Sequence, residues 1–325
     1  MPRPTYFPDN FTLAIVATVV IASVLPCAGT TARVFNVVTN IAIAALFFLH
    51  GAKLSREAVV AGATHWRLHL VVVLSTFALF PLLGLALKPV LAPLVTPDLY
   101  MGILFLCALP STVQSSIAFV AIARGNVPAA VCSASASSLL GIFLTPLLVG
   151  VLLATHHDAG TSTWKSIVDI CLQLLVPFIA GQIARKWIGS WVDRNRSTLK
   201  YVDQGSILLV VYTAFSEAVN QGLWQQMPLP ALGGLIVVCL VLLAIALWTT
   251  RFAARRLGFS KADEITIVFC GSKKSLATGV PMAKVLFPVD AVGAIVLPLM
   301  LFHQIQLMVC VVLAQRYAKR LTDQV

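Results

Sequence analysis

The chain is poor in charged residues. Only 11% of its 325 residues are charged and only 12 are acidic, whereas 59% are hydrophobic and the mean hydropathy is +0.92. Soluble domains carry about 25% charged residues, so a soluble protein of this size would lack the charge to cover its surface. The composition excludes a sizeable soluble domain and predicts an integral membrane protein whose main partner is the lipid bilayer.

The sequence also lacks the motifs of common enzymes and metal sites. It contains no H-E-x-x-H, P-loop or G-x-S-x-G pattern, so we expect no enzymatic activity, no catalytic residues and no cofactor. The seven cysteines show no C-x-x-C spacing and lie in or beside apolar runs, which indicates packing residues and not disulfides or metal ligands. The net charge of +11 comes from basic residues between apolar runs, so we expect no nucleic-acid partner.

Ten apolar runs divide the chain, each long enough for a transmembrane helix of about 20 residues. They cover residues 11–27, 34–52, 68–88, 99–123, 127–154, 165–186, 203–222, 229–250, 263–286 and 289–315. The charged residues of the segment before the first run are only Arg3 and Asp9, and no A-x-A cleavage site follows the run. We therefore expect a retained span and not a signal peptide. The predicted fold is all-α: ten transmembrane helices in one domain, residues 1–325.

The basic residues test this layout, because cytoplasmic loops carry an excess of Lys and Arg. With both termini in the cytoplasm, 17 of the 23 basic residues fall inside and two, Lys273 and Lys274, fall within a span. Only four fall outside, namely Arg33, Lys88, Lys165 and Lys284. The sequence thus predicts a multi-pass protein of the cell (inner) membrane with both termini cytoplasmic.

Five runs precede residue 160 and five follow it, so the second half would insert upside down relative to the first. Such inverted repeats, here about residues 11–154 and 165–315, are a common plan of secondary transporters. The fourth and ninth runs are interrupted at equivalent places, at Cys107–Ser116 and Cys270–Pro281. An offset of 163 residues pairs Ser111 with Lys274 and Ser115 with Thr278.

The two interruptions supply the candidate binding site. Pro110 removes a backbone donor, and Gly271, Gly279 and Pro281 loosen the ninth span. Unwound backbone in a membrane is tolerated where it lines a cavity or is buried in protein, so freed carbonyls and hydroxyls here could bind an ion or a polar solute. The alternative is that these residues only kink two packed helices. The candidates are Ser111, Thr112, Gln114, Ser115, Ser116, Ser272, Lys273, Lys274, Ser275 and Thr278.

Lys273 and Lys274 are the most informative of these residues. A lysine in mid-membrane costs roughly 2.5–3.5 kcal/mol on insertion scales, and intramembrane ionisable residues are functional candidates. Adjacent helical residues point about 100° apart, so both lysines can face one partner only if the helix unwinds. The alternative is a shifted span in which both side chains reach the interface.

Further polar residues lie on other spans. The fifth span carries Ser135, Ser137 and Ser138, which could line the site or could permit close helix packing. Glu217 and His303 could be proton carriers or counter-ions, or could hydrogen-bond a neighbouring helix. We expect the sequence His156-His157-Asp158 to be a solvated outside loop.

At these residues the chain resembles the bile acid:sodium symporter superfamily, and more closely its SBF-like branch, which bacterial proteins share with an orphan vertebrate solute carrier. The resemblance covers essentially the whole chain, and its most specific part is Gly271–Pro281, supported by Leu109-Pro110-Ser111 and Leu49–Leu54. It implies ten helices in two inverted repeats. A panel of spans 1, 2, 6 and 7 would face a core of spans 3–5 and 8–10, with broken helices 4 and 9 crossing.

The resemblance also implies a sodium site, from which this sequence departs. The sodium-binding Ser-Asn pair of sodium-coupled members falls on Ser115 and Ser116, and their span-5 S-x-S-T pattern falls on Ser135, Ser137 and Ser138. Their span-9 pattern E-x-G-x-Q-N falls on residues 269–274, where Phe269 replaces the carboxylate and Lys273 and Lys274 replace the amides. An ammonium group there would repel sodium, so sodium coupling is in doubt.

We therefore hypothesise that a lysine supplies the positive charge that sodium supplies elsewhere. A permanently charged lysine would make transport independent of cations and would attract an anion, whereas a lysine that loses its proton in a buried site could couple transport to protons. The expected function is secondary transport of a small organic anion by alternating access. The rival is a non-transporting membrane regulator of ion signalling that keeps the fold. The oligomeric state is not predicted.

Overall fold

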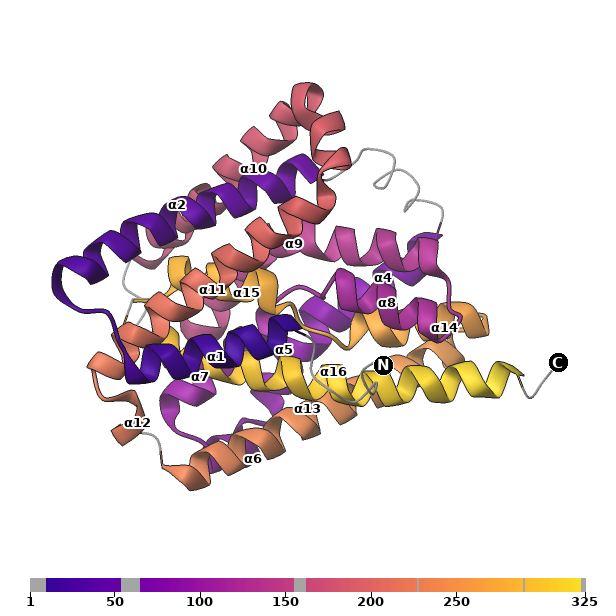
Figure 1. The fold of residues 1–325 in the computed structure, drawn as a ribbon. Helices are drawn as coiled ribbons and strands as arrows, with labels where there is room; N and C mark the ends of the chain where they lie inside the picture. Colours follow the sequence, from indigo (N-terminus) through magenta and orange to yellow (C-terminus); the bar gives the residue numbers. More distant parts are fainter. Residues whose placement is uncertain (1–9, 54–64, 155–161, 227, 289, 323–325) are drawn as a thin grey trace, which may run out of the picture.

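The computed structural model describes residues 10–53, 65–154, 162–226, 228–288 and 290–322, and every regular element among them is a helix (Figure 1). In the first half these are α1 (Asn10–Val24), α2 (Gly29–Lys53), α4 (Trp66–Leu74), the π-helix η2 (Ser75–Leu79), α5 (Phe80–Ala86), α6 (Lys88–Leu91), the 3-10 helix η3 (Ala92–Leu94), α7 (Pro97–Ala108), α8 (Gln114–Ile122) and α9 (Val127–Ala154). In the second half they are α10 (Ser162–Arg194), α11 (Arg196–Asn220), α12 (Leu223–Gln226), α13 (Leu229–Arg256), α14 (Lys261–Gly271), α15 (Leu276–Leu286) and α16 (Val292–Thr322).

The all-helical prediction is confirmed for the described residues. Five helical segments are long and apolar enough to cross a membrane: Gly29–Lys53, Trp66–Ala86, Val127–Leu152, Pro230–Arg256 and Val292–Lys319. Two shorter apolar helices, Leu13–Val24 and Pro97–Ala108, accompany them. The sequence His156-His157-Asp158 lies outside the described residues.

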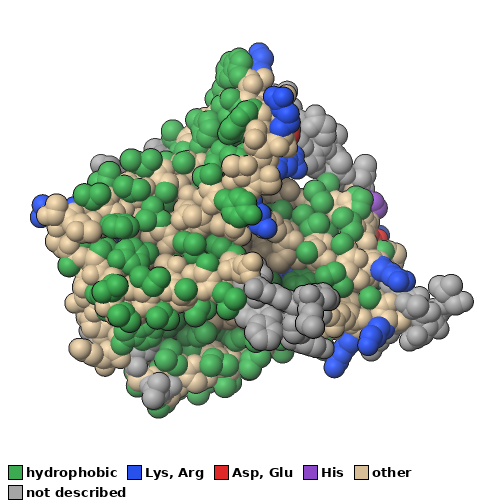
Figure 2. Space-filling view, viewed as in Figure 1, with side chains coloured by type: hydrophobic (Ala, Val, Ile, Leu, Met, Phe, Trp, Pro, Cys, Tyr) green, Lys and Arg blue, Asp and Glu red, His purple; other side chains and the backbone are tan. Residues whose placement is uncertain are grey.

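The surface of the bundle is apolar where its helices face outward. Val20, Ile41, Ile183 and Val237, on α1, α2, α10 and α13, are all at least 50% exposed, and Ile41 reaches 65%. In Figure 2 hydrophobic side chains cover much of the visible face, whereas Lys and Arg gather mainly at the upper tip, where α10 meets α11, and at the right-hand edge. This distribution suits a protein whose sides contact lipid and whose ends meet water.

The two sequence interruptions are real breaks between helices. Pro110 follows Leu109, whose backbone is extended (φ −75°, ψ 154°), the conformation that a following proline favours. The chain resumes as a helix at Gln114. In the second half α14 ends at Gly271, and Ser275 (φ −86°, ψ 112°) caps α15 by accepting a hydrogen bond from the Thr278 amide.

Small residues let α2 and α10 pack with their backbones close together. A Cβ atom on Gly51 would collide with the Phe178 carbonyl of α10, and one on Gly181 would collide with the Phe48 carbonyl of α2. Each glycine therefore leaves room for the backbone of the other helix, as small residues do at helix interfaces in membranes. Figure 1 shows the two helices running side by side along the upper edge of the molecule.

Candidate functional site

The two helix breaks lie against each other in the centre of the bundle. The Ser275 amide donates a hydrogen bond of 2.9 Å to the Pro110 carbonyl, which joins one break directly to the other. The Ser111 hydroxyl donates to the Cys270 carbonyl at 2.6 Å, and the Ser116 hydroxyl donates to the Phe269 carbonyl at 3.2 Å. Side chains of the first break therefore satisfy backbone groups at the end of α14, as unwound backbone buried in protein requires.

Lys274 joins the second break to η2 and to the end of α7. Its Nζ donates to the carbonyls of Thr76, Cys107 and Leu109 at 2.7, 2.8 and 2.7 Å, and the side chain is fully buried. An ammonium group has three donors, and here each donor has its own acceptor. The ring of Phe80 lies 4.2 Å from Nζ, which adds a cation–π contact. The arrangement matches that of a cation coordinated by backbone carbonyls.

The backbone of Lys274 is held as well. Its amide donates to Gln306 Oε1 at 3.0 Å, and its carbonyl accepts from Gln306 Nε2 at 2.9 Å. The same Nε2 lies 2.9 Å from His303 Nδ1. His303, a candidate proton carrier from the sequence, thus lies beside the lysine break through Gln306, a residue that the sequence analysis did not select.

Lys273 has the opposite environment. Its Nζ is fully buried but has no hydrogen-bond partner. Instead it lies 3.8 Å from the centre of the Phe119 ring and 5.6 Å from that of Phe269. The interface alternative for the two lysines is therefore wrong, since both side chains are enclosed, and the unwinding between α14 and α15 lets them point to different partners.

The hydroxyls of Ser115 and Ser116, at the positions of the sodium-binding pair, both bond to Thr112. The Ser115 hydroxyl donates to Thr112 Oγ1 at 2.8 Å, and Thr112 Oγ1 lies 2.9 Å from Ser116 Oγ. The nearby Phe269, where the resemblance implies a carboxylate, presents a hydrocarbon ring. The cluster offers neutral oxygens without the negative charge that would balance a cation.

The serines of α9 lie at the first break and in the lining of a cavity. Ser137 is buried, and its hydroxyl accepts a 2.9 Å hydrogen bond from the Ser111 amide at the first break. Ser135 and Ser138 line a cavity. Close packing is present too, because a Cβ on Gly141 would approach the Pro110 ring to 2.6 Å.

The cavity connects the breaks to one end of the bundle and has a volume of about 430 Å³. At the breaks it is bounded by Gln114 on the first turn of α8 and by Thr278 on α15. At its other end it is bounded by charged side chains of α2 and α11. The full lining comprises Phe47, His50, Lys53, Val113, Gln114, Ile117, Val131, Ser135, Ser138, Leu139, Ile142, Phe178, Arg196, Lys200, Asp203 and Thr278. An apolar body with a charged end is the shape that suits an amphipathic anion.

The remaining candidates from the sequence lie at the end of α14, at the cavity wall and near the end of α11. The Ser272 hydroxyl, at the C-cap of α14, donates to the Val268 carbonyl at 2.6 Å. Thr278 Oγ1 is buried and lacks a hydrogen-bond partner at the cavity wall. Glu217 accepts from Gln221 at 3.3 Å near the end of α11 and not from the residues of the breaks.

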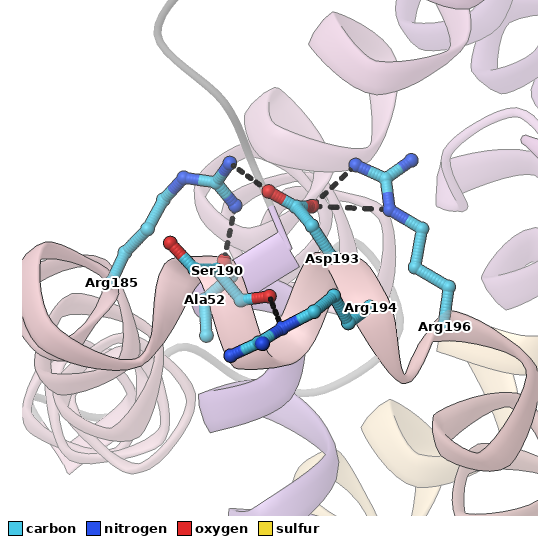
Figure 3. A network of polar contacts seen from close by, with 6 residues as sticks. All are labelled: Ala52, Arg185, Ser190, Asp193, Arg194 and Arg196. Atoms are coloured by element: carbon cyan, nitrogen blue, oxygen red, sulfur yellow. Dashed lines mark hydrogen bonds and ion pairs between the residues drawn. The ribbon is translucent and has the colours of Figure 1, made fainter.

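A surface network holds the charged end of the cavity. In Figure 3 Asp193 lies between Arg185 and Arg196, with contacts of 3.2 Å to Arg185 and of 2.6 and 3.1 Å to Arg196. The hydrogen bonds from Arg196, followed by the charge of Arg185, lower the pKa of the Asp193 carboxyl. Arg185 also donates to the Ala52 carbonyl at 2.5 Å, which ties the end of α10 to the end of α2.

Known proteins are similar in sequence to this chain over most of its length. The model of the SBF-like CPA transporter family matches residues 9–319. An uncharacterized protein of Pseudomonas aeruginosa is 71% identical over 99% of this chain and 97% of its own length. "Putative symporter YfeH" of Escherichia coli is 58% identical over 97% of this chain and 94% of its own length. Mouse "Sodium/bile acid cotransporter 7" is 29% identical over 83% of this chain and 80% of its own length.

These matches agree with the motifs around the two breaks. The family model covers both breaks, both lysines and the cavity lining. The chain therefore belongs to the SBF-like CPA transporter family within the bile acid:sodium symporter superfamily, and it is a multi-pass membrane transport protein.

Proposed function

We propose that the protein is a secondary transporter of a small organic anion that works by alternating access around the two helix breaks, without sodium. The observation that carries this proposal is the bonding of Lys274 Nζ to three backbone carbonyls. A fixed ammonium there supplies the positive charge that a bound ion would otherwise bring. The solute would occupy the adjoining cavity, whose lining combines apolar walls with three basic side chains at one end.

The proposed architecture is the one that the family resemblance implies. Ten spans would form two inverted repeats, about residues 11–154 and 165–315, with α7–α8 and α14–α15 as the crossing broken helices. Spans 1, 2, 6 and 7 would form the panel and the other six the core. The basic loops favour an orientation in the cell (inner) membrane with both termini cytoplasmic, which would place the charged end of the cavity on the cytoplasmic side.

The first experiment needs no known solute. The detergent-purified protein is unfolded by heat in sodium, potassium or choline at matched ionic strength, because a ligand of the folded state raises stability by RT ln(1 + [L]/Kd). We expect the same Tm in all three salts. A sodium-specific rise that requires Ser115 and Ser116 would contradict the proposal, since it would mean that their hydroxyls still bind an ion.

Transport itself is tested by solute uptake into reconstituted vesicles at several pH values. The double variant Lys273→Gln/Lys274→Gln is the informative comparison. Loss of uptake supports an essential charge, and altered pH dependence supports proton coupling. Unchanged uptake and unchanged pH dependence would contradict both roles, and the absence of uptake of any organic anion by the unmodified protein would favour a non-transporting regulator.

A further inference from the structure

The charged end of the cavity is unevenly balanced. Lys53 is the last residue of α2, and Arg196, Lys200 and Asp203 lie on the first turns of α11. All four line the cavity, so three basic groups face one carboxylate. Arg196 shares its charge with Asp193 on the outer side. A positive surplus thus remains at the mouth of a cavity whose walls are otherwise apolar.

The carboxylate is bound on one side only. Asp203 Oδ2 forms an ion pair with Lys53 Nζ, and the two side chains are 18% and 24% exposed. Asp203 Oδ1 is buried and has no hydrogen-bond partner. An ionised carboxylate can accept about four hydrogen bonds, and a buried acceptor without a partner is costly. Asp203 therefore neutralises Lys53 with a poorly satisfied group.

We propose that Lys53 is the binding site for the acidic group of the solute, and that Asp203 occupies this site until the solute's acid replaces it. This inference rests on the proposed transport of an anion. A solute acid beside Lys53 would have its apolar part against Phe47, Ile142 and Phe178, which line the same cavity. The expected ligand is an amphipathic carboxylate or a similar acid, small enough for about 430 Å³.

The replacement would also change how two helices are joined. The Lys53–Asp203 pair links the C-terminal end of α2 to the N-terminal part of α11. When the solute's acid takes Lys53, this link opens, and Asp203 is released to water at the cavity mouth. Binding of the solute and loosening of the α2–α11 contact at this end would then be one event, which is how a ligand shifts a conformational equilibrium.

Octanoate is a suitable probe, because it joins a carboxylate to a short apolar chain. The full chain is purified in detergent, and its Tm is followed against octanoate concentration, with octanamide as the neutral control. We expect Asp203→Asn to lower the half-saturating octanoate concentration by about tenfold, which corresponds to about 1.4 kcal/mol. Asp98→Asn removes the same charge at an exposed position outside the cavity lining and should leave the octanoate response unchanged.

Two further variants complete the test. Lys53→Met should abolish the octanoate response, both alone and together with Asp203→Asn. Asp203→Glu keeps a carboxylate and should bind octanoate with affinity close to that of the unmodified protein; Asp203→Ser replaces Asp203→Asn if the latter does not fold.

Equal octanoate affinity in the unmodified protein and in Asp203→Asn would overturn the inference, while the anion site and the proposed transport would stand. No octanoate response in either protein would overturn it too. Uptake into vesicles by the unmodified protein then tests the transport function separately, since that measurement detects transport whether or not Asp203 yields its place to the solute.

Discussion

Lys273 and Lys274 are neighbours in the sequence and are equally buried. The Lys274 ammonium has a hydrogen-bond acceptor for each of its three donors, whereas the Lys273 ammonium has no hydrogen-bond partner. Lys274 Nζ has three carbonyl acceptors, whereas Lys273 Nζ has only aromatic faces. The difference arises because the helix ends at Gly271 and leaves the two side chains free to point apart. Burial alone therefore does not assign a role to an intramembrane charge, and the supply of acceptors around it does.

The largest expected effect comes from removing the bonded lysine. Lys274→Met would leave the carbonyls of Thr76, Cys107 and Leu109 without their donor. A buried acceptor left without a donor costs about 1–3 kcal/mol, and three carbonyls lose theirs here, so we expect a loss of stability of about 3 kcal/mol or more and a loss of uptake. The measurement is the Tm in detergent together with vesicle uptake; a Tm within one degree of that of the unmodified protein would remove Lys274 from its central role.

A smaller effect should follow from releasing the backbone of the same lysine. Gln306→Leu removes both hydrogen bonds between the Gln306 amide group and residue 274. A buried group left without a partner costs about 1–3 kcal/mol, so we expect a destabilisation of about 2 kcal/mol. Gln304→Leu, two residues earlier on α16, is the control and should be close to neutral. Equal Tm values for the two variants would contradict the assignment.

Removal of the other lysine should change stability least among the buried sites. Lys273→Met takes away a charge without hydrogen bonds and keeps a side chain of similar shape, and such replacements are often neutral or stabilising. We expect a change within about 1 kcal/mol. A double-mutant cycle with Phe119→Leu should give a coupling of about 0.5–2 kcal/mol, the range of a cation–π contact. A destabilisation as large as that of Lys274→Met would show an interaction partner that this structure does not contain.

The smallest change in stability should come from breaking an exposed ion pair, which serves as a reference for the effects at the buried lysines. Asp193→Asn removes the contacts with Arg185 and Arg196, and exposed pairs contribute up to about 1 kcal/mol. Because Arg196 lowers the pKa of Asp193 in the folded state, this contribution is present above the ordinary carboxyl pKa of about 3.9. It is lost as the pH falls through the lowered value. Tm profiles of the two proteins should therefore converge at low pH, and a constant difference down to pH 2 would contradict this.

Much of the local structure was predictable from the sequence. Pro110 favours an extended Leu109, and Gly271 followed by the serines and lysines indicates the second interruption. The length of the apolar run on either side of the lysines favoured a buried or cavity-lining position for at least one of them. These are local effects, in which a residue type restricts its own backbone or the sequence nearby.

The partners of the lysines were not predictable in the same way. Thr76 lies almost 200 residues from Lys274 in the sequence. Its carbonyl belongs to a π-helix that no simple sequence pattern predicts. Gln306 could have been selected as a polar residue in an apolar run one turn from His303, but only the packing of α16 against the break shows which glutamine matters. The Lys53–Asp203 pair likewise depends on the contact between α2 and α11.

The covalent attachment of the Lys274 ammonium has an energetic consequence for transport. A sodium ion that binds on one side of a membrane and leaves on the other contributes its electrochemical gradient to every cycle. A tethered ammonium contributes charge but never dissociates, so it carries no gradient. The driving force for uphill movement would then have to come from a second solute moving in exchange, from a proton or from the membrane voltage, which acts on a mobile charge with about 2.3 kcal/mol per 100 mV.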